Sequence, residues 1–314
     1  MLKAKQKTLS VADRRIWEID FVRGVIIIGM LVDHFMFFLG MFGGLYAEGI
    51  VPSWLQGLSD FAYHYWRNEA KIAVRFIGLF LFFLLTGISS KFSRSNLKRS
   101  LICIGFGIFL SLVYMTYSLI SGNRYYSIFG VITCLGVCML LYWAGKALYL
   151  KLGKDEKYWK WWALGIGIAM SIAGFIMNLC VSTDLRFGHI FLSMFGEFNP
   201  NNGTGSNNPL TFGTAIQTII GSYAWGNDWL GILPYLGFTF IGGFVGEHIY
   251  ANRKSIFLRK DPEKNQNFNA KAIRKTWVIN WLGAKTFIIY VIHPVVIVLF
   301  LGIIFFIATG RLPF

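Results

Sequence analysis

Long apolar runs alternate with short polar segments along most of the chain. Seven of these runs reach about 18 residues or more, which is the length that an α-helix needs to cross the hydrocarbon core of a bilayer. They cover approximately residues 22–43, 73–90, 100–120, 127–145, 161–181, 230–250 and 282–307. The pattern predicts an all-α integral membrane protein, a polytopic bundle of about seven transmembrane helices.

The composition supports the same interpretation. Of the 314 residues, 55% are apolar and only 14% are charged, about half the charged share of a typical soluble domain. A soluble protein of this length could not hide so much apolar surface, and the apolar content also excludes a disordered chain. The length gives no reason for a second domain, so we expect a single membrane-embedded domain over residues 1–314. The four cysteines lie inside apolar runs and are expected to serve as packing residues.

The net charge of +15 has two readings, a nucleic-acid partner or a membrane topology signal. The placement of the basic residues decides between them, because 24 of the 30 lie in or next to alternate segments. These segments are 1–20, 91–99, 146–160 and 251–275. The positive-inside rule then places the N-terminus in the cytoplasm and the C-terminus outside the cell membrane. No nucleic-acid partner is needed to explain the charge.

Two segments on the predicted outer side are long enough to form structure of their own. The first, 44–72, carries Trp54, Trp66 and His64. The second, 182–229, holds a stretch rich in Asn, Gly and Pro, which is typical of a loop. The half-apolar residues that follow, Leu210–Trp225, favour a short helix lying on or dipping into the membrane. We therefore expect extra short helices in the outer loops.

The first apolar run contains three ionisable residues, Arg23, Asp33 and His34. Ionisable groups inside a membrane are costly and are functional candidates by default. Arg23 and His34 are eleven residues apart, so a helix puts both on one face, about 16 Å from each other. Histidine can carry a proton near neutral pH, and arginine can grip a phosphate. The alternative is an arginine that extends to the interface and a histidine bonded to a carbonyl group.

Asp33 is adjacent to His34, and adjacent helical residues do not face each other. We therefore expect Asp33 to pair with a group on another helix.

A second buried histidine, His293, precedes Pro294 in the last apolar run. Counting the helical rise from each run's inner end puts His34 and His293 at a similar depth, which favours a shared pocket. Pro294 has no N–H group, so the carbonyl of Tyr290 needs another partner or lines a polar cavity. A packing histidine bonded to a backbone oxygen is the alternative.

Several stretches in a fixed order resemble the catalytic-domain family of heparan-alpha-glucosaminide N-acetyltransferase, over nearly the whole chain. They are Arg15-Ile16-Trp17-Glu18-Ile19-Asp20-Phe21-Val22-Arg23-Gly24, Leu85-Thr86-Gly87-Ile88-Ser89 with Phe92-Ser93-Arg94-Ser95-Asn96-Leu97-Lys98-Arg99, Ile128-Phe129-Gly130-Val131, Asp228-Trp229-Leu230-Gly231-Ile232-Leu233-Pro234-Tyr235-Leu236-Gly237 and Ile289-Tyr290-Val291-Ile292-His293-Pro294. The spacing of Arg23 and His34 is also similar to that in the membrane acyltransferases that O-acetylate polysaccharides.

The resemblance implies an acetyltransferase that takes acetyl groups from cytoplasmic acetyl-CoA. His34 maps onto the catalytic histidine, as a general base or as an acyl-accepting nucleophile. Asp33 beside it is the second candidate for a catalytic role. Arg23 would hold a phosphate of coenzyme A, and Arg94 and Arg99 are further candidates for that contact. No metal is expected in the reaction.

The acceptor implied by the resemblance is a sugar amine or hydroxyl at or across the membrane. Asp228 lies among aromatic residues at the outer end of the 230–250 run, an arrangement that suits a sugar acceptor. His293 is the second candidate for acceptor binding. The lipid bilayer and a glycan acceptor are therefore the expected partners, and a homo-oligomer is compatible with the sequence.

Two other classes of protein share some of these features. In a proton-coupled transporter, Asp33, His34 and His293 would form a proton relay, but no inverted repeat is visible. A retinal-type receptor is suggested by seven helices and Lys285 in the last run. The inferred orientation, with Lys285 near the cytoplasm, argues against it.

Overall fold

A computed structural model of the chain describes residues 16–42, 52–121, 127–199, 211–225, 229–251, 255–256, 271 and 274–310. This part of the chain is helical and has no β-strand. Six of its helices are long and apolar enough to cross a membrane. They are α1 (Trp17–Phe42), α3 (Glu69–Ser90), α4 (Asn96–Ser121), α5 (Val131–Lys151), α6 (Glu156–Val181) and α12 (Thr286–Thr309). The predicted all-α, multi-pass membrane fold is confirmed.

The helix count needs a correction at the run predicted for 230–250. That run forms a shorter helix, α9 (Tyr235–His248), which is not among the six candidate spans of the described residues. Pro234 explains the late start, because proline has no N–H group and disfavours helical backbone in the residue before it. Fourteen residues give a length of about 21 Å, short of the roughly 30 Å hydrocarbon core.

Short helices occupy the predicted outer segments, as expected. They are α2 (Ser53–Arg67), the 3₁₀ turn η3 (Phe187–His189), α7 (Ile190–Met194) and α8 (Phe212–Ile220). α8 falls inside the half-apolar stretch and begins with a capping box between Thr211 and Thr214. It ends at Gly221, whose φ of 119° is accessible to glycine but strained for other residues.

The chain divides into two compact units. Unit 1 comprises residues Met1–Gly78 and Asn252–Phe314, and unit 2 comprises Leu79–Ala251, so the boundary falls within α3. A single domain over the whole chain stays a prediction.

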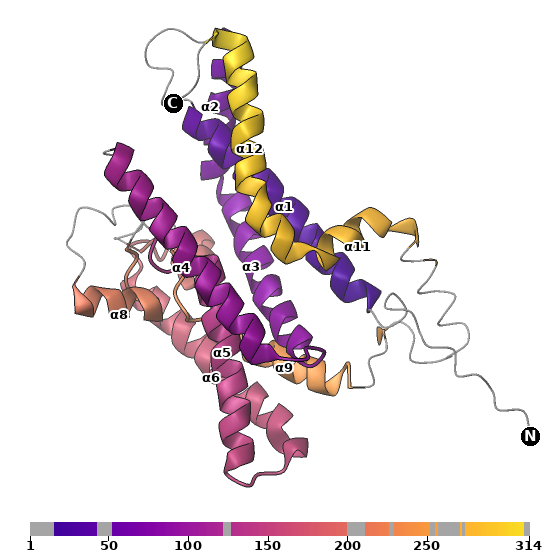
Figure 1. The fold of residues 1–314 in the computed structure, drawn as a ribbon. Coiled ribbons are helices and arrows are strands. Elements are labelled where there is room, and N and C mark those ends of the chain that lie inside the picture. Colours follow the sequence, from indigo (N-terminus) through magenta and orange to yellow (C-terminus); the bar gives the residue numbers. More distant parts are fainter. Residues whose placement is uncertain are drawn as a thin grey trace, which may run out of the picture. The chain divides into compact units, whose positions relative to one another are not determined.

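In unit 1, α1 contacts α2, α11 (Trp277–Ala284) and α12 (Figure 1). The apolar core between α1, α2 and α12 consists of Leu39, Leu55, Ala62, Ile297, Leu301 and Phe305. The contact between α1 and α11 depends on Gly24 and Gly283, because a Cβ at either position would overlap the backbone of the opposite helix. Gly24, which follows Arg23 in the sequence, is therefore needed for close helix packing.

In unit 2, α4 packs against α5, and α9 packs against α6 and α5. Trp159 is buried and its Nε1 donates a hydrogen bond to the Tyr142 hydroxyl, 3.2 Å away. At the end of α9, the Glu247 carboxylate is paired with Lys91 and, at 2.8 Å, with Lys146. Glu247 thus joins the ends of α3, α5 and α9 inside this unit.

Candidate functional site

Two histidines from different helices meet in unit 1. The ring centroids of His34 in α1 and His293 in α12 are 4.7 Å apart, and the ring planes are at 82° to each other. His293 lies on the buried stripe of α12, which continues with Ile297, Leu301 and Phe305. It is 5% exposed. The predicted meeting of the two histidines is confirmed.

Backbone hydrogen bonds determine which ring nitrogen carries the proton. Nδ1 of His34 lies 2.9 Å from the Met30 carbonyl oxygen, and Nδ1 of His293 lies 2.8 Å from that of Tyr290. Because a carbonyl oxygen can only accept, Nδ1 donates in both cases, and Nε2 of each neutral ring is the basic nitrogen. Both histidines are therefore bonded to the backbone and still present a proton acceptor.

His293 also satisfies the carbonyl that Pro294 leaves without its usual helical donor. Proline at 294 removes the N–H group that would bond the Tyr290 oxygen, and Nδ1 of His293 takes its place. The Nε2 atom of His293 is buried without a hydrogen-bond partner in the described structure. A buried polar atom of this kind is costly unless a water or ligand binds it.

Asp33 forms the cross-helix pair that its position predicts. Its Oδ1 atom lies 2.6 Å from Nζ of Lys71 in α3, and the two side chains are 14% and 8% exposed. The Lys71 ammonium also lies 3.3 Å from the centroid of the Trp66 ring, a favourable cation–π arrangement. Asp33 therefore neutralises a cation close to the histidine pair and turns away from His34.

Arg23 lies near the start of α1, beside α11. Its Nη1 atom is 3.3 Å from Oδ1 of Asp20, and the two side chains are 17% and 11% exposed. A guanidinium group is a permanent cation with a planar set of N–H donors, and Asp20 can orient that of Arg23. About 16 Å of helix separates Arg23 from His34.

The remaining predicted site residues lie elsewhere. Arg94 precedes α4 and Arg99 lies in its first turn, both exposed and both in unit 2. Asp228 lies outside the described residues. Its neighbour Trp229 donates from Nε1 to the Thr218 carbonyl, 2.9 Å away. Unit 1 thus brings together Asp33, His34 and His293, with Arg23 on the same helix as the first two.

A hollow at the junction of α2 and α3 was missed by the sequence reasoning. It encloses about 320 Å³ and is lined by Phe61, His64, Tyr65, Asn68 and Lys71. Burial, together with the negative charge of Asp33, raises the pKa of Tyr65. One feature of the sequence could have pointed to this hollow. Arg67, Lys71 and Arg75 follow one another at intervals of four residues, in one of the segments that otherwise carry few basic residues.

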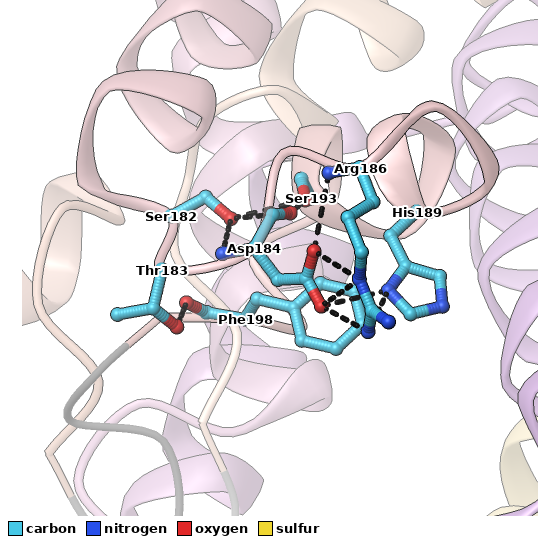
Figure 2. Close-up of polar contacts among 7 residues, drawn as sticks. All are labelled: Ser182, Thr183, Asp184, Arg186, His189, Ser193 and Phe198. Atoms are coloured by element: carbon cyan, nitrogen blue, oxygen red, sulfur yellow. Dashed lines mark hydrogen bonds and ion pairs between the residues drawn. The ribbon is translucent and has the colours of Figure 1, made fainter.

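A separate ionic cluster orders the outer segment of unit 2 (Figure 2). The Asp184 carboxylate accepts hydrogen bonds from Arg186, at 2.6 Å, and from Nδ1 of His189, at 2.8 Å. These donors, Arg186 first, hold the pKa of Asp184 well below its usual range. The Ser193 hydroxyl donates to the Asp184 carbonyl at 2.6 Å, which joins α7 to the same loop.

The described residues contain no group of three or more His, Cys, Asp or Glu side chains placed to hold a metal ion.

Comparison with known proteins gives one match. Residues 15–295 match the family model described as heparan-alpha-glucosaminide N-acetyltransferase, catalytic. The matched range includes every predicted site residue. No curated protein and no solved structure matches the chain.

Proposed function

Because the chain belongs to the heparan-alpha-glucosaminide N-acetyltransferase catalytic family, which consists of membrane acetyltransferases, we propose that it transfers acetyl from acetyl-CoA to a glycan hydroxyl or amine. His34 and His293 form the catalytic centre of this reaction. The observation that carries the proposal is the 4.7 Å contact between the two rings, each bonded to the backbone through Nδ1.

The reaction requires a base at the point of transfer. When the acceptor oxygen or nitrogen attacks the thioester carbonyl carbon, it loses a proton, and Nε2 of His34 accepts it. The bond between the carbonyl carbon and sulfur breaks, and the coenzyme A thiolate leaves and takes up a proton. In a covalent variant, Nε2 of His34 attacks the carbonyl first and the acceptor then attacks the acetyl-histidine.

His293 binds the acceptor in this scheme. Its buried Nε2 atom can accept a hydrogen bond from a second N–H of an attacking amine, or from a hydroxyl next to the attacking one on a sugar. This contact would hold the nucleophile beside His34 and would satisfy the unpartnered atom. We also assign acceptor binding to Asp228, on the strength of the family resemblance.

The donor approaches from the cytoplasmic end of α1. Arg23 holds a phosphate of coenzyme A, and the pantetheine arm extends along the helix for about 16 Å to His34. Arg94 and Arg99 contribute further positive charge. This assignment places the N-terminus in the cytoplasm and the C-terminus outside, in agreement with the distribution of basic residues.

Labelled acetyl-CoA tests the proposal. Detergent-purified protein should release coenzyme A and pass the label to a sugar when glucosamine or methyl glucoside is supplied. Label retained on the protein without an acceptor would identify the covalent route. A protein that binds acetyl-CoA but transfers label to no acceptor, water included, would contradict the proposal.

A further inference from the structure

The hollow between α2 and α3 is open and largely apolar, with a few polar groups in its lining. Its residues come from the last turns of α2, the connecting Asn68 and the first turn of α3. Its volume of about 320 Å³ is at the lower end of the range for small-molecule sites, which suits a single sugar ring. Its walls combine the aromatic rings of Phe61 and Tyr65 with the polar groups of His64, Asn68 and Lys71.

We propose that this hollow is the acceptor subsite and binds one saccharide ring of the acceptor. The proposal rests on the acetyltransferase function given above and adds a site to it. An aromatic ring with a polar tip, such as Tyr65, offers an apolar face to the C–H groups of a sugar and a hydroxyl to its oxygens. A carboxamide and an imidazole supply the donors and acceptors that sugar hydroxyl groups need.

The walls of the hollow are held by packing and by hydrogen bonds. On α2, the buried residues Leu55, Ser59 and Ala62 form one face of the helix, and Leu55 and Ala62 belong to the core of unit 1. The Asn68 side-chain oxygen accepts from the backbone N–H of Lys71 at 3.2 Å. This contact orients the Asn68 carboxamide, whose NH₂ group can donate a hydrogen bond to a ligand.

Lys71 connects the hollow to the catalytic pair. It lines the hollow, and its Nζ atom bonds Asp33, the residue next to His34 in α1. An acceptor in the hollow therefore contacts Lys71, whose partner Asp33 precedes His34 in α1. Arg23, the proposed donor contact, lies near the opposite end of α1. Donor and acceptor would thus reach His34 from opposite ends of one helix.

A matched pair of tyrosines on α2 allows a direct test. Tyr65 lines the hollow, whereas Tyr63 is exposed and packs under Arg67, whose guanidinium carbon lies 4.2 Å from the ring centroid. Tyr65→Ala should raise the KM for methyl glucoside or glucosamine by about five- to tenfold, the effect of losing one stacking surface and one hydrogen bond. Tyr63→Ala should leave the KM for methyl glucoside and the KM for glucosamine within about twofold of the wild-type values.

Hydroxylamine serves as a second acceptor that needs no sugar subsite. Tyr65→Ala should acetylate hydroxylamine at the wild-type rate and keep the wild-type KM for acetyl-CoA. If Tyr65→Ala does not fold, Tyr65→Phe and Asn68→Asp replace it, and each should raise the KM for the sugar alone by about threefold.

The outcomes separate the two proposals. Equal sugar KM values for the Tyr65 and Tyr63 variants would overturn the subsite and leave the acetyltransferase function intact. Transfer to hydroxylamine but to no sugar would overturn the subsite and the glycan acceptor, and would leave only the use of acetyl-CoA. A wild-type protein that acetylates neither hydroxylamine nor a sugar would overturn both. A rise in sugar KM confined to the residues of the hollow supports the subsite.

Discussion

The buried ion pair between Asp33 and Lys71 offers a quantitative test of how unit 1 is held together. Asp33→Asn would leave the Lys71 ammonium without its anion, and Lys71→Met would leave the Asp33 carboxylate without its cation. Both side chains are less than one-sixth exposed, so water replaces the lost partner only in part. The double variant Asp33→Asn/Lys71→Met removes both charges together.

The expected loss of stability in each single variant follows from the geometry of the pair. At a separation of 2.6 Å, the Coulomb attraction is about 6 kcal/mol at an effective dielectric constant of about 20. The desolvation of both ions offsets most of it, so the intact pair is worth little, but removing one partner costs roughly 3–5 kcal/mol. In a chain of this size that corresponds to a fall in the melting temperature of roughly 6–10 °C. The double variant should show a smaller fall in melting temperature than either single variant.

Thermal unfolding in detergent, followed by tryptophan fluorescence, measures the four melting temperatures of this cycle. Glu156→Gln is the control, because the carboxylate of Glu156 also pairs with a lysine, Lys146, but is 63% exposed. It should change the free energy of unfolding by less than about 1 kcal/mol. If the effects of Asp33→Asn and Lys71→Met simply add in the double variant, the two residues are not coupled and the reasoning is refuted.

Three further predictions concern other parts of the chain. Arg23→Ala should weaken acetyl-CoA binding far more than acceptor binding. Arg23→Lys should restore acetyl-CoA binding only in part, because a point charge replaces a bidentate donor. Normal acetyl-CoA affinity in the alanine variant would remove Arg23 from the donor site. Because the folded-state pKa of Asp184 is depressed, its stabilisation of the outer loop should persist from neutral pH down to about pH 4 and disappear below it. Hydrogen exchange of the 183–198 amides should therefore be faster in Asp184→Asn throughout that window, and equal protection at pH 5 would speak against the cluster. For the topology, a single cysteine is placed at Asn202 or at Asn267 in a protein that lacks the four native cysteines. In intact cells an impermeant thiol reagent should label the cysteine at position 202 and not the one at position 267. The reverse pattern would invert the topology.

The apolar runs predicted the long helices well, since bilayer-spanning length is a strong signal in a single sequence. The run over 230–250 was interpreted as a span because apolar composition does not show where a helix begins. Pro234 keeps the residues before it out of the helix, so α9 begins only at Tyr235 and is short and largely buried. Its glycines, such as Gly237 against the backbone of α6, show that it packs against protein. A buried helix of this kind has the same composition as one that faces lipid.

The functional residues were predictable where local geometry determined their environment. Pro294 and the matching depths were enough to place His293 with His34, and helical spacing was enough to turn Asp33 towards another helix. The environment of Glu247, which is 14% exposed and paired with two lysines, could not be predicted, because partners more than a hundred residues away cannot be found from spacing. The hollow lined by Tyr65 was missed for a similar reason, since its walls form only where two helices meet.

Acetyl transfer by His34→Asn tests the central claim most directly. Asparagine keeps polar contacts but cannot accept a proton, so the rate should fall by roughly 10²–10⁴-fold if His34 is a general base, and nearly to zero if it carries the acetyl group. Acetyl-CoA binding should stay unchanged, because the proposed phosphate contact at Arg23 is about 16 Å away. His248→Asn, outside the pair, is the matched control and should keep the wild-type rate. Near-native turnover by a folded His34→Asn protein would contradict the account and would make His293 the next candidate for the base.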